Sequence, residues 1–145
     1  MSQHKDPKSN AVRNLNDRFR KGDPYVTGRV VLTSGIQSIC SMDGDGNGKK
    51  PSNETLEQLL EKVRTFDEFT EDNDPYGEHD FGAFTFEGDR VFWKIDYYDL
   101  DLRYGSEDPS DPAKTTRVLT IMFNHEYYND PQKLDHVLSD ICARK

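Results

Sequence analysis

One segment of the sequence has the residue types and spacing of a calcium-binding loop. Residues 43–54 match the pattern D-x-[DN]-x-[DN]-G-x5-E at every fixed position. Gly48 would permit the sharp turn that such a loop needs. The sequence therefore predicts calcium as a candidate cofactor, with ligands from the side chains of Asp43, Asp45, Asn47 and Glu54 and from the Lys49 carbonyl.

Two features weaken the expected affinity of this loop. Lys49 and Lys50 bring positive charge close to the ion, and residues 30–40 lack a helical pattern, so the loop would join a strand to a helix. Asp, Gly and Asn are also the ordinary residues of surface turns. A solvated loop insertion at residues 41–53 therefore remains the alternative.

A second cluster follows at residues 71–80, where five carboxylates and one histidine lie within ten residues. Oxygen and imidazole groups can bind a metal ion, and neighbouring carboxylates can separate their pKa values to act as acid and base. The alternative is a loop whose side chains cap its own backbone. The candidate metal ligands or binding-surface residues are Asp72, Asp74, Glu78, His79, Asp80, Asp96 and Asp99.

Two further candidates follow the predicted hairpin. Asp108 lies in an acidic, Pro-rich stretch, and Arg117 begins an apolar segment. An arginine there can hold a carboxylate through two parallel hydrogen bonds, which would fix the acidic stretch. We include both residues in the candidate binding surface.

Apolar periodicity predicts the elements that must position these groups. Helices are expected from Ser9 or Asn10 to Lys21, over residues 54–66, and from Asp130, which caps a helix with Pro131 at its first position. Strands are expected at 28–33, 81–86, 90–99 and 116–123, with residues 35–40 extending the first strand or forming a helical turn.

This order lacks regular βα alternation and therefore predicts the α+β class. We expect one antiparallel or mixed sheet of about four strands with three flanking helices. Residues 1–8 are expected to be a disordered lead, and residues 9–145 a single domain.

Composition excludes several classes of protein. The 145 residues carry a net charge of −8, and residues 67–111 alone hold 15 acidic and three basic side chains. Such a chain is poorly suited to binding nucleic acid directly. It has no apolar stretch long enough to span a membrane and no visible export signal, so we expect a cytoplasmic location.

Three segments resemble a bacterial family catalogued as domain of unknown function 3768, whose members are often plasmid-borne. They are Phe66–Gly82, Trp93–Asp99 and Ser106–Met122, and Glu126-Tyr127 fits as well. The resemblance covers roughly residues 10–128. It implies no activity, and it makes residues 43–54 an insertion relative to the family.

Two functional hypotheses follow from these observations. The first is a non-enzymatic acidic protein that binds or inhibits a basic macromolecular partner, in the manner of a nucleic-acid mimic or an anti-defence protein. The second is a metal-dependent hydrolase that uses the cluster at residues 72–80. The sequence favours the first, because the acidic stretch is rich in aromatic residues and so is held by folded structure. It does not indicate an oligomeric state.

Overall fold

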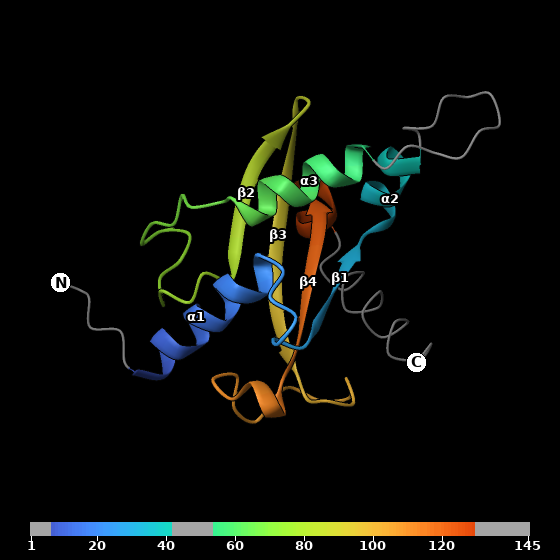
Figure 1. The fold of residues 1–145 in the computed structure, drawn as a ribbon. Helices are drawn as coiled ribbons and strands as arrows, with labels where there is room; N and C mark the ends of the chain where they lie inside the picture. Colours follow the sequence, from blue (N-terminus) through green and yellow to red (C-terminus); the bar gives the residue numbers. More distant parts are fainter. Residues whose placement is uncertain (1–6, 42–53, 130–145) are drawn as a thin grey trace.

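The computed structural model describes residues 7–41 and 54–129, and its centre is one four-stranded sheet (Figure 1). The strands are β1 (Gly28–Leu32), β2 (Phe81–Phe86), β3 (Asp89–Tyr98) and β4 (Thr116–Phe123). They lie in the order β1-β4-β3-β2, with β1 parallel to β4 and the other pairs antiparallel. The predicted α+β class with a mixed sheet is confirmed.

The described helices are α1 (Pro7–Arg20), α2 (Ser34–Ser41), α3 (Glu54–Arg64) and α4 (Asn124–Asn129), with one 3-10 turn at Pro112–Lys114. α1 begins two residues before the expected helix, at Pro7, because proline suits the first helical turn. Residues 35–40 form part of α2 rather than an extension of β1. α4 was not predicted, and the helix expected from Asp130 lies outside the described residues.

The two faces of the sheet bury different clusters. On one face, Trp93, Ile95 and Ile121 pack against Leu59 and Val63 of α3, and α1 covers the same side (Figure 1). On the opposite face, Phe92 and Met122 contact Phe81 and Tyr127, while a second group joins Leu102 to Val31 and Val118. Successive residues of β3 therefore alternate between the two faces.

The β2–β3 hairpin closes through a two-residue turn at Glu87 and Gly88. Both residues have positive φ, of 52° and 88°, which is the backbone conformation of the type I′ turn that matches the twist of a hairpin. Every residue of β4, between β1 and β3, is buried. No helix among the described residues is long and apolar enough to cross a membrane.

Candidate functional site

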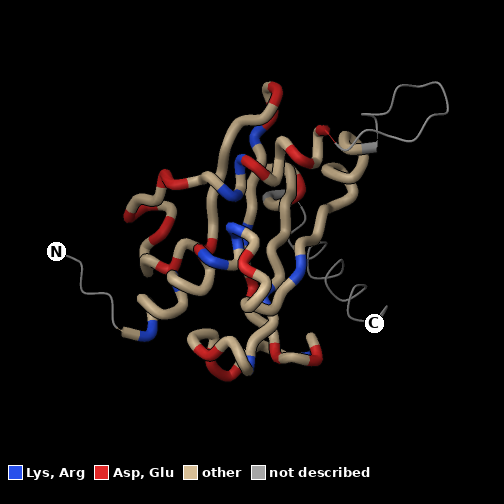
Figure 2. Tube along the Cα trace, viewed as in Figure 1, with Lys and Arg blue, Asp and Glu red and all other residues tan. Residues whose placement is uncertain are grey.

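The acidic residues of the stretch 67–111 lie mainly in three parts of the chain rather than on one face. Figure 2 shows them along the α3–β2 loop, at the hairpin tip and in the segment between β3 and β4. The α3–β2 loop holds seven carboxylates and no lysine or arginine between Thr65 and Asp80. These carboxylates fall into an outward group and an inward group.

The outward group consists of Asp67, Glu68, Glu71 and Asp72, which are all exposed. Local hydrogen bonds shape their loop, since the Thr70 amide donates to Asn73 Oδ1 and the Asn73 side chain donates to the Glu68 carbonyl. Asp72 therefore lies on the surface, as a binding residue must.

The inward group begins with Asp74 and His79. The buried Asp74 side chain accepts hydrogen bonds from the amides of Glu78 and His79, at 3.0 and 3.1 Å. The His79 ring stacks on Phe69, and its Nδ1 lies 2.9 Å from Asp17 Oδ1 of α1. Asp74 thus caps its own loop, as the alternative interpretation of this segment predicted.

Asn16 of α1 connects the inward group to the sheet and is fully buried. Its side-chain amide donates to the Glu78 carbonyl at 3.0 Å and to the Tyr97 hydroxyl at 2.8 Å. Its carbonyl accepts from Arg117 Nε at 2.6 Å. The Tyr97 hydroxyl donates to Glu78 Oε1 at 3.3 Å. We call Asn16, Glu78, Tyr97 and Arg117 the α1 cluster.

Arg117 differs from its predicted role. Its side chain is fully buried, and its second hydrogen bond runs from Nη2 to the Pro109 carbonyl at 2.7 Å, so it holds two neutral oxygens instead of a carboxylate. The expected two-bond carboxylate contact is therefore wrong, although the arginine does anchor the acidic stretch. Because burial removes water from the charge, it lowers the pKa of Arg117 and raises that of Tyr97.

Asp80 directly precedes β2, and Asp96 lies on the Phe92 and Lys94 face of β3. Burial raises the pKa of Asp80, and the nearby carboxylates of Asp74 and Asp96 raise it further. Lys94 Nζ forms an ion pair with Asp96 Oδ2 on β3, at 2.9 Å. No group of three or more His, Cys, Asp or Glu side chains in residues 7–41 and 54–129 is placed to hold a metal ion.

Four of the five predicted calcium ligands fall within residues 42–53. Asp43, Asp45, Asn47 and Lys49 lie outside the described residues, and Glu54 begins α3 with an exposed side chain. The predicted calcium site stays a prediction.

A pocket of about 560 Å³ is lined by the segment that connects β3 to β4. This segment lies at the end of the sheet opposite the hairpin tip (Figure 1). We call it the acidic pocket. Three of its lining side chains are acidic and one is basic, and two apolar side chains are unusually exposed, Leu100 at 53% and Tyr104 at 73%. Its lining residues are Asp99, Leu100, Asp101, Tyr104, Gly105, Glu107, Ala113 and Lys114.

Backbone contacts hold the acidic pocket in shape. The Asp99 amide donates to the Tyr104 carbonyl, and Asp99 Oδ1 accepts from the Arg103 amide, a bond that lowers the pKa of the Asp99 carboxyl. Leu102 has a φ of 61°, which is costly for a branched side chain, yet it is buried against Val31 and Val118. Its burial fixes the loop that presents Leu100 and Tyr104.

Asp108 lies beside this pocket rather than in it. Its carboxylate accepts hydrogen bonds from the hydroxyl and amide of Ser110, which lower its pKa, and Lys8 Nζ approaches to 3.7 Å. Of the candidate residues, then, Asp72 and Asp99 face outward at separate places. Asp74, Glu78, His79 and Asp80 gather beneath α1, where Arg117 is fully buried, whereas Asp96 lies with Lys94 on the other face of β3.

The sequence prediction missed Leu100, Asp101, Tyr104 and Glu107 of the acidic pocket and Asn16 of the α1 cluster. Asn16 left a usable signal, because it lies between Leu15 and Phe19 on the apolar stripe of α1, where a polar side chain needs a buried partner. For the pocket, the only signal in the sequence was the strongly acidic composition of the segment that lines it.

The model of the family described as "Protein of unknown function (DUF3768)" matches residues 32–126, well over half of the chain. The chain belongs to this family. The match contains β2, β3, β4 and the acidic pocket, and it begins after α1, so it is shorter than the expected resemblance over residues 10–128. No curated protein and no solved structure matches the chain.

Proposed function

We propose that this member of the family is a non-enzymatic binding protein whose acidic pocket receives a lysine or arginine side chain from a basic protein partner. The observation that carries the proposal is the pairing of carboxylates with exposed apolar side chains in one concave site. Asp101 and Glu107 supply negative charge, while Leu100 and Tyr104 supply apolar area.

This combination suits a long basic side chain. The aliphatic part of a lysine or arginine packs on apolar groups while its charged end reaches carboxylates, and an aromatic face attracts the cation further. Partially exposed aromatic residues are also typical of the residues that dominate binding energy in protein interfaces. Because its backbone is held by internal hydrogen bonds, the pocket would lose little entropy on binding.

The inward carboxylates support a binding protein over a hydrolase. Asp74, Glu78 and His79 are engaged with the backbone, Tyr97 and Asp17 respectively, and they connect α1 to the sheet. They do not line the acidic pocket. We therefore assign them a structural role.

The test is a titration of the isotope-labelled protein with N-acetyl-arginine amide, followed by amide chemical shifts. We expect saturable shifts at residues 99–107 and 113–114, which weaken as salt is added. The double variant Asp101→Asn/Glu107→Gln should abolish them. The matched control, Glu71→Gln/Asp72→Asn, removes the same charge from the α3–β2 loop and should leave the titration unchanged.

Shifts spread evenly over all acidic segments, or equal losses in the two double variants, would contradict the proposal. Either result would mean that net charge alone attracts the cation. Leu100→Ser should weaken binding without changing charge, because it removes apolar contact area.

A further inference from the structure

β2 is an edge strand with one side open among the residues that the structure describes. The Ile95 amide donates to the Asp80 carbonyl, so Asp80 and Ile95 form a hydrogen-bonded pair. Such pairs alternate along an antiparallel ladder. The backbone N–H and C=O groups of Phe81, Ala83 and Thr85 therefore point away from β3, toward the open side.

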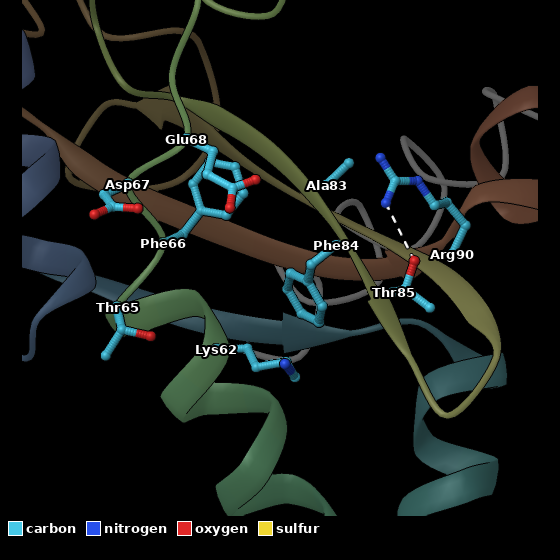
Figure 3. Close-up of a pocket in the computed structure, with 9 residues that line it drawn as sticks. All are labelled: Lys62, Thr65, Phe66, Asp67, Glu68, Ala83, Phe84, Thr85 and Arg90. Carbon is cyan, nitrogen blue, oxygen red and sulfur yellow. Dashed lines mark hydrogen bonds between the residues drawn. The ribbon is translucent and has the colours of Figure 1, made fainter.

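A groove of about 350 Å³ runs beside this open edge (Figure 3). Its basic residues lie near the hairpin end, where Lys62 Nζ is 5.9 Å from the Phe84 ring and Arg90 Nη1 donates to Thr85 Oγ1 at 3.3 Å. Its acidic residues, Asp67 and Glu68, lie at the other end beside Phe66 (Figure 3). The groove is thus basic at one end and acidic at the other.

We propose that β2 pairs with β2 of a second copy of this chain, antiparallel and centred on Ala83, to form a continuous eight-stranded sheet. A two-fold axis at Ala83 places Phe81 of each copy opposite Thr85 of the other. An aromatic side chain opposite a β-branched one is a favourable cross-strand pair. The six outward N–H groups at positions 81, 83 and 85 of the two strands would all find acceptors.

The other face of the same pairing places Phe84 opposite Gly82 of the second copy. The Trp93 ring lies over Gly82 in each copy, so Phe84 would meet this indole rather than an empty space. Ala83 meets itself at the axis, where its small side chain avoids a clash.

Charge selects this arrangement over a parallel one. The two-fold axis exchanges the ends of the groove, so Lys62 of each copy approaches the Asp67 and Glu68 end of the other. A parallel pairing would bring the like-charged ends together and would be repelled. This charge complementarity favours a second copy of the chain as the partner of the β2 edge.

The first test is sedimentation equilibrium of the full chain over a wide concentration range. We expect a reversible dimer for the wild type and a monomer for Ala83→Pro, because proline removes an outward N–H that β3 does not use. Circular dichroism and thermal melting would check that Ala83→Pro retains its fold. A wild type that stays monomeric throughout the range, or a folded Ala83→Pro that still dimerises, would overturn the proposal.

Charge reversal decides the question even if Ala83→Pro does not fold. Lys62→Glu should weaken dimerisation by about tenfold, since the exchange acts twice in a two-fold dimer. The double variant Lys62→Glu/Glu68→Lys should restore it. Equal weakening in the single and double variants would overturn the antiparallel pairing. Glu61→Lys, on the same helix but outside the groove, is the matched control.

Discussion

The α1 cluster and the acidic pocket are built from similar groups in opposite environments. Each contains a tyrosine, at least one carboxylate and one cation, but Arg117 is fully buried whereas Tyr104 is 73% exposed. In the α1 cluster, hydrogen bonds join α1, the α3–β2 loop and β3 to β4. In the acidic pocket the backbone is held, while Leu100, Tyr104 and Glu107 face solvent.

The difference shows that the number of acidic residues in a segment does not indicate how many of them are exposed. Residues 71–80 contain five carboxylates and one histidine, yet most of these groups form contacts that hold the fold together. The pocket is less dense in charge but combines exposure, concavity and apolar contact. Substitutions of the buried groups should therefore lower the free energy of unfolding more than substitutions of the exposed groups.

The largest effect is expected for Arg117→Ala. It leaves Asn16 Oδ1 and the Pro109 carbonyl without their donor and opens a cavity, so the free energy of unfolding should fall by about 3–5 kcal/mol. Lys114→Ala removes a cation from the acidic pocket and should change it by less than about 0.5 kcal/mol. Urea denaturation measures both, and similar losses in the two variants would remove the distinction between the regions.

A somewhat smaller loss is expected for Asn16→Ala. The substitution removes one side chain with three hydrogen bonds, to Glu78, Tyr97 and Arg117, and should cost about 2–3 kcal/mol. Asn14→Ala, at an exposed position of the same helix, should be neutral or slightly stabilising because alanine favours helix. If thermal melting gave both variants the wild-type midpoint, Asn16 would not connect α1 to the sheet.

The two tyrosines provide a finer comparison with a single atom removed from each. Tyr97→Phe deletes a hydroxyl that both donates and accepts, and should cost about 1 kcal/mol of unfolding free energy. Tyr104→Phe should have no measurable effect on stability, since its ring is mostly in solvent. Chemical denaturation of both variants measures these free energies of unfolding. A larger loss of stability in Tyr104→Phe than in Tyr97→Phe would contradict the prediction.

The smallest effects should have opposite signs in the two regions and depend on pH. Because the folded-state pKa of Asp80 is raised, its stabilising contribution is complete below about pH 4 and is lost as pH rises through that pKa. Asp80→Asn should therefore raise the melting temperature at pH 7, with a gain that disappears in acid.

Asp99 behaves in the opposite way. Its pKa is lowered, so its contribution is present above about pH 4 and is lost as pH falls through the folded-state value. Asp99→Asn should lower the melting temperature at pH 7, with a deficit that shrinks in acid. Melting curves of both variants from pH 3 to pH 7 provide the check, and shifts of the same sign would contradict the assigned environments.

The regular elements could be predicted because each carries its own signal. The alternation of Val91, Trp93 and Ile95 with Phe92 and Lys94 gave β3 and its two faces, and the periodic leucines gave α3. The parallel pairing of β1 with β4 had no comparable local signal, because it depends on contacts between residues about 90 positions apart. α4 was missed because six residues are too few for a periodic pattern.

The candidate sites were harder to predict because burial decides their roles. Leu100 and Leu102 alternate with aspartates in the sequence, and nothing local indicates that Leu102 is buried while Leu100 is exposed. In the same way, Arg117 at the start of β4 could have held a carboxylate. The carbonyl of Pro109 and the side chain of Asn16 reach it only in the folded chain.

The position of β4 between β1 and β3 has a consequence for synthesis on the ribosome. β1 is made first, but its neighbour in the sheet is the last strand to emerge, after the β2–β3 hairpin is already complete. Until β4 emerges, the backbone groups on one edge of β3 have no partner strand, and neither does β1. Non-local pairing of this kind slows folding, and unpaired strand edges recruit other chains. Nascent chains halted before residue 116 should therefore depend on chaperones more than completed ones.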